Sequence, residues 1–168
     1  MVTFAEEKMK YMKVELKVQD LLQRASNDKY YIALLREKEG TRSLPILVGL
    51  LEAQAIAMYL KEVSTERPML HDLLASMANA FDICINEVYI YKVQNGVFYS
   101  YLVCEQHGQA VNVDARTSDA IAIALHQGRP VDAFWNGMES INRFTRGIMG
   151  GDHIQIGYSF CIHNAIQL

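Results

Sequence analysis

Several side chains that perform acid–base and phosphate chemistry lie close to expected helix starts. They are four carboxylates, one imidazole and one guanidinium: Glu52, His71, Asp72, Asp114, Arg116 and Asp119. Hydrolysis of a phosphodiester bond needs a positioned water and charge stabilisation at the phosphate, and Mg²⁺ or Mn²⁺ held by carboxylates supplies both. The residue types therefore suit a hydrolase, although their spacing matches no strong nuclease motif and the sequence contains no glycine-rich phosphate loop.

Each of these residues has a role that its chemistry allows. The candidate catalytic residues are the proton-exchanging groups Asp114, Asp119, His71 and Glu52, with His71 as the candidate general base. The candidate ligands of Mg²⁺ or Mn²⁺ are the three aspartates Asp114, Asp119 and Asp72. Arg116 is the candidate phosphate clamp, because a guanidinium binds phosphate oxygens in a bidentate way.

The same residues also have purely structural explanations. Glu52 in a first helical turn would balance the helix dipole, and His71 would be a surface histidine near a helix start. Arg116 between Asp114 and Asp119 would be an ion-pair network that holds a strand to a helix. Exposure separates the two interpretations. An open groove lined by both aspartates and His71 favours an enzyme, and burial of the aspartates by Arg116 disfavours one.

The most informative stretch is a strand that runs into an apolar helix. Residues 109–113 alternate between apolar and polar side chains, and residues 117–125 are rich in alanine and isoleucine. Thr117 or Ser118 can cap this helix, and Gly128 ends it. A helix with so little polar surface must be buried. The polar residues before it are therefore expected at the mouth of a buried junction.

Two further helices are predicted, at residues 49–61 and 69–81. The first is apolar on most sides, whereas the second has amphipathic spacing with His71 on its polar side. Alternating or β-rich segments predict strands at residues 12–18, 30–36, 43–48, 87–93, 97–104, 109–113 and 153–163. Hairpin turns are predicted at 37–40 and at Asn95-Gly96. The pattern indicates an α+β domain with an antiparallel or mixed sheet and about three helices.

The chain divides into an N-terminal extension (1–9), one domain (10–135) and a C-terminal extension (136–168) that ends in an extra strand. That strand would pair with its own sheet or with a partner's. Four tyrosines of the second sheet section would stack nucleobases if they shared an exposed face: Tyr89, Tyr91, Tyr99 and Tyr101. Half-buried cross-strand pairs are the preferred interpretation of these tyrosines.

The segment Asp114-Ala115-Arg116-Thr117-Ser118-Asp119-Ala120-Ile121-Ala122 resembles the signature of the bifunctional nuclease domain family, formerly a domain of unknown function. Three other segments agree in order and spacing: 44–57, 67–74 and 95–99. The resemblance covers roughly residues 10–135. It implies a compact α+β domain, usually a homodimer, in which some members act as both DNase and RNase. Arg67 and Ser118 lie in these segments and are further candidates for substrate binding.

Composition points to a cytoplasmic protein of ordinary globular type. The 168 residues contain no apolar run of the ~18 residues that a membrane helix needs, and the start of the chain lacks a signal peptide's apolar core. Cys84, Cys104 and Cys161 are spaced as reduced thiols, without metal-type pairing. The expected partners are nucleic acid and a second copy of the chain, and no membrane.

The net charge of −3 disagrees with tight nucleic-acid binding, because proteins that hold nucleic acid through its phosphates usually carry a basic face. The acidic charge favours the alternative function class, a non-catalytic dimeric module that binds a small ligand or a protein and regulates it. The family resemblance favours the nuclease.

Overall fold

The structure is a computed structural model that describes residues 13–24, 30–39, 42–134 and 154–156. Its strands are β1 (Lys13–Arg24), β2 (Tyr30–Glu37), β3 (Ser43–Gly49), β4 (Ile83–Gln94), β5 (Val97–Gln106), β6 (Gln109–Arg116), β7 (Val131–Phe134) and β8 (Ile154–Ile156). The helices of the described residues are α2 (Leu50–Leu60), α3 (Leu70–Ala80) and α4 (Thr117–His126). The prediction of an α+β domain with about three helices is confirmed.

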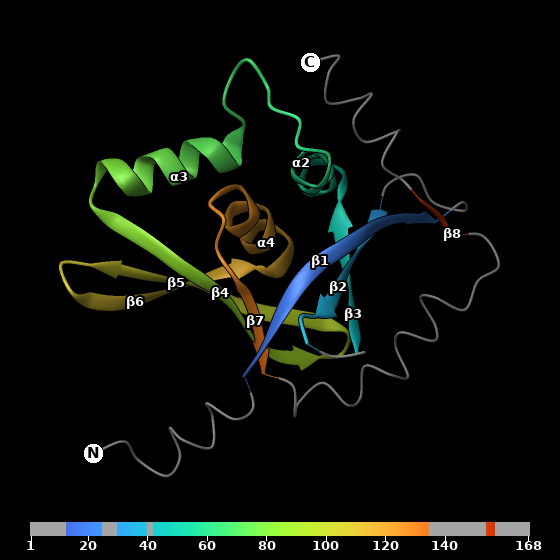
Figure 1. The fold of residues 1–168 in the computed structure, drawn as a ribbon. Coiled ribbons are helices and arrows are strands. Elements are labelled where there is room, and N and C mark those ends of the chain that lie inside the picture. Colours follow the sequence, from blue (N-terminus) through green and yellow to red (C-terminus); the bar gives the residue numbers. More distant parts are fainter. Residues whose placement is uncertain (1–12, 25–29, 40–41, 135–153, 157–168) are drawn as a thin grey trace, which may run out of the picture.

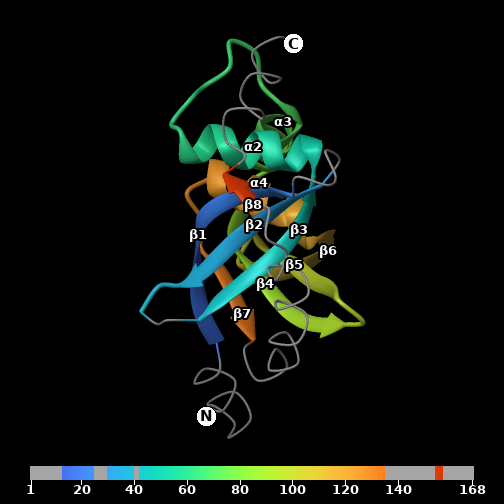
Figure 2. The ribbon, with the colours of Figure 1, turned by 90° about the vertical axis from the view of Figure 1, so that its right-hand side faces the viewer.

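The strands form one mixed sheet in the order β3-β2-β1-β7-β4-β5-β6. Every described pair is antiparallel except β4 with β7, which is parallel. β8 pairs with the far end of β1, opposite Leu22 to Arg24, so the described part of the C-terminal extension joins its own sheet. The sheet curves around α4, and α2 and α3 lie on the same side of it (Figures 1 and 2).

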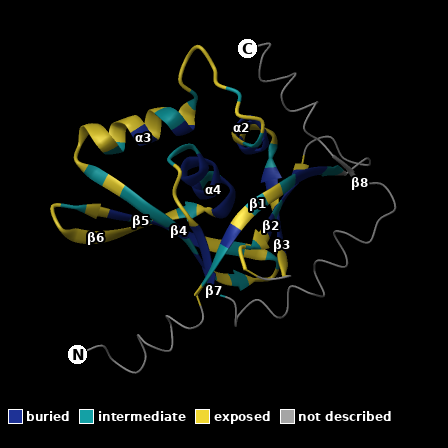
Figure 3. Cartoon of the chain, viewed as in Figure 1, coloured by how far each residue is buried: buried dark blue, intermediate teal, exposed yellow. Residues whose placement is uncertain are grey.

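α4 is buried along nearly its whole length, as its sequence predicts (Figure 3). Every residue from Ala120 to Leu125 is buried, and the helix contacts α2, α3 and strands β3 to β6. Each isoleucine that it buries stabilises the fold by about 1.5–3 kcal/mol relative to an exposed one. The alanines let neighbouring backbones approach closely. Among the described residues, no helix is long and apolar enough to span a membrane.

The predicted turns are confirmed where the structure describes them. Asn95 and Gly96 both have positive φ angles, 52° and 77°, as a primed two-residue hairpin turn requires. His107 and Gly108 repeat this conformation between β5 and β6. Pro45 lies on β3, which is an edge strand, so its missing amide costs no hydrogen bond in the sheet interior.

Two local features differ from the sequence predictions, and a third prediction is tested only in part. β7 was not predicted, because four residues after a proline give little periodic signal, yet it lies in the middle of the sheet. The predicted side-chain cap of α4 is wrong: Thr117 and Ser118 lie inside the helix, and Arg116 is its N-cap residue. Of the predicted strand at 153–163, residues 154–156 are strand and the remainder lies outside the described residues.

The orientation of α3 also differs from the expectation for an amphipathic helix. The described residues leave its apolar face exposed (Figure 3), with 65% of Leu70 and 64% of Phe81 accessible. The buried side chains are His71 and Ala75, on the face that was expected to be polar. The periodicity was therefore correct, but it does not tell which face the domain covers.

A buried acidic pair lies on the sheet face away from the helices. Asp132 on β7 and Glu87 on β4 both form ion pairs with Lys13 of β1. Burial raises the pKa of Asp132 to about 6, and its hydrogen bond with Glu87 acts in the same direction. Because the folded pKa exceeds the ordinary value of 3.8, the fold favours protonated Asp132, and this stabilisation is lost as the pH rises through about 6.

We therefore predict that Asp132→Asn raises the free energy of unfolding at pH 7.5 by about 1–2 kcal/mol, because the amide is permanently neutral. The gain should shrink at pH 5, where wild-type Asp132 is largely protonated. Urea unfolding at the two pH values measures this, with Glu105→Gln, an exposed carboxylate of β5, as the control. An equal gain at both pH values would contradict the assignment.

Candidate functional site

A pocket of about 1180 Å³ lies between α2, α3, β6, the start of α4 and the connector 61–69. Its volume exceeds the ~300–1000 Å³ typical of small-ligand sites. Its walls combine aliphatic side chains with ionisable ones, and the ionisable residues are Glu52, Glu66, Arg67, His71, Asp114, Arg116 and Asp119. The aspartates at 114 and 119 thus share one open pocket with His71, and Arg116 does not bury them.

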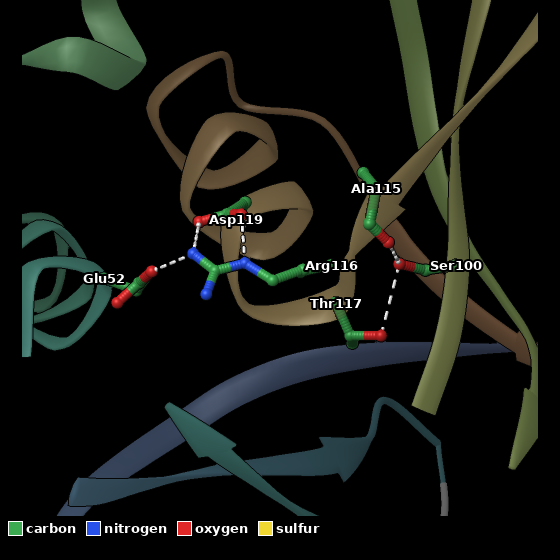
Figure 4. A network of polar contacts seen from close by, with 6 residues as sticks. All are labelled: Glu52, Ser100, Ala115, Arg116, Thr117 and Asp119. Atoms are coloured by element: carbon green, nitrogen blue, oxygen red, sulfur yellow. Dashed lines mark hydrogen bonds and ion pairs between the residues drawn. The ribbon is translucent and has the colours of Figure 1, made fainter. Parts of the chain in front are cut away.

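Arg116 forms a three-way ion pair at the junction of β6 and α4 (Figure 4). Its Nε donates to Asp119 Oδ2 at 2.8 Å, and its Nη2 donates to Asp119 Oδ1 at 3.0 Å and to Glu52 Oε1 at 2.6 Å. We call Glu52, Arg116 and Asp119 the Arg116 network. The hydrogen bond between Arg116 and Asp119 is the largest cause that raises the pKa of the Arg116 guanidinium above its ordinary value.

The third nitrogen of the guanidinium, Nη1, is unused by the described residues and points away from both carboxylates (Figure 4). The Arg116 side chain is 73% exposed, whereas that of Glu52 is only 11% exposed. Two carboxylates thus fix the plane of a guanidinium whose remaining N–H groups are accessible. A guanidinium held in this way can donate to an anion that enters the pocket.

A close backbone approach explains how Glu52 reaches Arg116 from the first turn of α2. The Glu52 carboxylate lies back over Gly49, and a Cβ at that position would be 2.6 Å from Oε2. Gly49 has an ordinary φ of −76°, so a side chain at this position would not strain the backbone but would have to displace the Glu52 carboxylate. The sequence alone suggested both a helix-dipole role and a reach toward the site, and the structure shows the reach directly.

Asp114 lies apart from the Arg116 network. It lies opposite Tyr101 of β5, so its side chain shares a sheet face with that tyrosine, and it contributes to the pocket lining together with its neighbours Val113 and Ala115. No cation of the described residues pairs with Asp114. The ion pair that was expected between Arg116 and Asp114 is replaced by one with Glu52, which lies 64 residues earlier in the chain.

His71 is buried at the start of α3 and lines the pocket, with 6% of its surface accessible. Its Nδ1 is enclosed and has no hydrogen-bond partner, so Nε2 is the nitrogen that remains for a ligand. Burial lowers the pKa of His71, and the nearby His126 lowers it further. The interpretation of His71 as a surface histidine is therefore wrong. It is a buried imidazole at the wall of a cavity, and its lowered pKa favours the neutral form.

Asp72 and His126 are neighbours of His71. Asp72 Oδ2 accepts from the backbone N–H of Met69 at 2.9 Å, and its Oδ1 lies 3.3 Å from His126 Nδ1. Sequence reasoning missed His126, because a polar residue in the last turn of an apolar helix is ordinary. Its only signal was that it interrupts the alanine and isoleucine pattern.

The remaining candidates are placed as follows. Arg67 lines the pocket from the connector, where the Thr65 hydroxyl donates to the Arg67 carbonyl oxygen at 2.5 Å. Ser118 is buried inside α4 and does not line the pocket. Thr117 donates to the Ser100 hydroxyl at 3.2 Å, and Ser100 donates to the Ala115 carbonyl at 3.0 Å, which ties the junction to β5 (Figure 4).

The proposed metal ligands do not come together as a cage. Within the described ranges, no three His, Cys, Asp or Glu side chains are grouped closely enough to hold a metal ion. Asp119 is bound to Arg116, and both oxygens of Asp72 are engaged by Met69 and His126. The described residues therefore do not fit a fully protein-bound Mg²⁺ or Mn²⁺.

The tyrosines of the second sheet section pack against one another, as preferred from the sequence. Tyr89 is opposite Tyr101, and the rings of Tyr91 and Tyr101 stack with centroids 4.2 Å apart. A hydrogen bond with Tyr101 raises the pKa of Tyr91 to about 12. Since Tyr91 and Tyr101 cover each other's faces, they do not form a row of free stacking surfaces.

Comparison with protein families identifies the domain to which this pocket belongs. The sequence model of the bifunctional nuclease domain matches residues 33–136. The chain belongs to the bifunctional nuclease domain family. The matched range contains every ionisable residue that lines the pocket. β1 precedes the matched range, yet it lies between β2 and β7 in the sheet of this bifunctional nuclease domain.

Two uncharacterized proteins of Mycobacterium tuberculosis, one from strain CDC 1551 / Oshkosh and one from strain ATCC 25618 / H37Rv, are similar to this chain. Each is 41% identical over 100 residues, which is 60% of this chain and 59% of the relative. The aligned part thus spans less than two thirds of either relative. Their names state no activity.

The Arg116 network generates a prediction about stability. Arg116→Ala leaves the mostly buried Glu52 without its cation, and we expect a loss of about 1–2 kcal/mol in the free energy of unfolding, reduced by the exposure of Arg116. Glu52→Gln in the same chain should restore part of this loss. Urea unfolding of the single and double variants measures the coupling. Arg36→Ala, at an exposed arginine of β2, is the control, and purely additive losses would contradict the coupling.

Proposed function

We propose that this domain is a cytoplasmic nuclease that hydrolyses phosphodiester bonds of DNA or RNA in the pocket beside the Arg116 network. The observation that carries the proposal is that one pocket, within a bifunctional nuclease domain, gathers a neutral buried histidine and two arginines. These groups supply the proton acceptor and the phosphate-binding charge that the reaction needs.

In this proposal, His71 is the general base. A base must be unprotonated at working pH, and burial together with His126 lowers the pKa of His71 so that it stays neutral. It accepts a proton from the attacking water through Nε2. Arg116 holds a phosphate oxygen through Nη1, and Arg67 contributes a second cation from the connector. Glu52 and Asp119 then act by orienting Arg116.

The charge of the pocket supports a role for an added cation. Its carboxylates outnumber its guanidinium groups: Glu52, Glu66, Asp114 and Asp119 against Arg67 and Arg116. A phosphodiester would be repelled by this surplus unless a cation accompanied it. Mg²⁺ commonly uses one or two carboxylates and takes its other ligands from water and substrate. Asp114 and Glu66 are the two pocket carboxylates that have no cation partner among the described residues, and Asp114 is the one that the sequence also suggested as a metal ligand.

The test is a cleavage assay with labelled RNA and DNA in Mg²⁺, Mn²⁺ or EDTA. His71→Gln should lower kcat by about 10²–10⁴-fold if His71 is the general base. Arg116→Lys should raise KM and lower kcat, because lysine lacks the fixed fork of donors. His107→Gln, on the exposed β5–β6 turn, is the matched control and should be fully active.

Two outcomes would contradict the nuclease proposal. One is the absence of cutting by folded wild-type protein under every metal condition. The other is cutting that persists in His71→Gln and Arg116→Lys, which would indicate a contaminant or another site. Cutting that EDTA and Asp114→Asn both leave unchanged would remove only the metal from the proposal.

The second candidate function is a homodimeric module that binds a ligand or protein and regulates it. The exposed apolar face of α3 favours it, together with the edge strand β6, which lines the same pocket. Exposed apolar side chains of this surface are Leu70, Leu73, Leu74, Met77, Phe81, Val111 and Val113. β6 is unpaired on its outer side within the described sheet, and an unprotected edge pairs readily with a second copy.

We predict that Met77→Glu with Phe81→Glu turns the proposed dimer into a monomer, because each copy would bring charges into an apolar interface. Sedimentation velocity at several protein concentrations gives the mass. Leu47→Glu on β3, an equally exposed apolar residue at the opposite edge of the sheet, should remain dimeric. A monomeric wild-type protein, or a dimer that survives both charges, would contradict this surface.

A further inference from the structure

Gln54 of α2 carries a buried amide that the fold itself leaves unused. Only 3% of its surface is accessible, and it forms no hydrogen bond with the described residues. Neither amide atom is fully enclosed by protein, and the residue lines the pocket, so the amide meets the pocket space. Buried polar side chains normally have a protein partner, and an apolar residue of similar size would fill this position without the cost of burying an amide. The packing of α2 therefore does not explain this residue.

Gln54 lies between two apolar residues on the face of α2 that lines the pocket. Leu51, Gln54 and Met58 follow one another at helical spacing, and all three contribute to the lining. Leu70 and Leu74 of α3 line the pocket as well. The amide thus offers a donor and an acceptor side by side among aliphatic side chains. Such a site suits a planar ligand with apolar faces and a polar edge.

The same helix also orients the phosphate-binding group of the pocket. Glu52, two residues before Gln54, accepts from Arg116 Nη2 at 2.6 Å. Arg116 Nη1, which the described residues leave unused, therefore belongs to the same pocket as the Gln54 amide. A ligand that joins an anionic group to a planar ring with a hydrogen-bonding edge matches both features. A nucleotide is such a ligand, because its phosphate suits a guanidinium and its base edge suits a glutamine amide.

We propose that Gln54 is a specificity-determining residue that hydrogen-bonds the edge of an unpaired nucleobase, so that the pocket takes single-stranded nucleic acid. The inference rests on the proposed nuclease, in which Arg116 holds the phosphate. Each common base has a donor next to an acceptor on its Watson–Crick edge, and the glutamine amide can turn over to match either order. Gln54 therefore distinguishes a base from no base, and not one base from another.

Duplex nucleic acid does not fit this arrangement. The Gln54 side chain is almost wholly buried, so a base must leave its stack and enter the pocket to reach the amide. In a duplex the bases are stacked and their Watson–Crick edges are paired, and extruding one of them costs free energy. An unstacked base of a single strand presents its faces to the aliphatic walls and its edge to the amide without that cost.

The test is a binding measurement by fluorescence anisotropy in EDTA. Three labelled probes are compared: a short single strand of DNA, the same strand annealed to its complement, and an abasic strand with the same number of phosphates. Wild-type protein should bind the single strand about tenfold more tightly than the abasic strand, because only the former can pair with Gln54. It should also bind the duplex more weakly than the single strand.

Gln54→Met keeps the size of the side chain and removes both the donor and the acceptor. It should lose most of the preference for the base-bearing strand, while its affinity for the abasic strand stays unchanged. Gln94→Met, at an exposed glutamine of β4 outside the pocket, is the matched control and should behave as wild type. Circular dichroism melting shows whether each variant folds, and Gln54→Ala, which needs no extra space, replaces Gln54→Met if that protein does not.

Several outcomes would overturn the proposal. Wild-type protein that binds none of the probes, or that binds the abasic strand or the duplex as tightly as the single strand, is the first. The second is a Gln54→Met protein that keeps the preference. The third is a Gln54→Met protein that loses affinity for all three probes equally, because this result indicates a structural role.

The binding results are separate from those of the cleavage assay. Protein that cuts nucleic acid without preferring the base-bearing strand would keep the nuclease and lose this inference. Protein that never cuts but shows a preference dependent on Gln54 would lose the nuclease and keep the inference. AMP as a fourth probe distinguishes a strand from a free nucleotide, and AMP binding without strand binding would overturn the strand as the ligand together with the nuclease.

Discussion

The burial of α4 is the constraint on which the rest of this domain depends. A helix of alanine and isoleucine has no side that water can solvate, so the sheet must curve around it and other helices must cover the remaining side. Polar groups can then meet it only at its two ends. The N-terminal end holds Arg116 and Asp119, and the C-terminal end holds His126. The polar contacts of α4 are concentrated at the two ends of this buried helix.

The fold was predictable where local chemistry decides the structure. The apolar stretch of α4, the amphipathic period of α3 and the Asn95-Gly96 turn each have one favourable conformation. Two features could not be predicted because they depend on distant partners. β7 is too short to show a period, and it pairs with β1 and β4, which are distant from it in the sequence. The exposure of the α3 apolar face likewise depends on what the domain does not cover.

The candidate site shows the same division. Residue types alone selected Glu52, His71, Arg116 and Asp119, and these do line one pocket. The pairing within the site was predicted less well, because proximity in the chain suggested Asp114 as a partner of Arg116. Because side chains alternate along β6, Asp114 shares a sheet face with Tyr101. The carboxylate that pairs with Arg116 in its place is Glu52 from α2. His126 escaped notice because its partners are 54 and 71 residues away.

Asp72 illustrates why these distant contacts decide between chemical roles. A carboxylate that ligates a divalent cation must give an oxygen to it. Here one oxygen accepts from the amide of Met69, the N-cap residue of α3, and the other lies near His126, so ligation would release one of these two contacts. Either release would disturb His71, which precedes Asp72 in the first turn of α3. The geometry therefore fits Asp72 to the support of the α3 start and not to metal ligation.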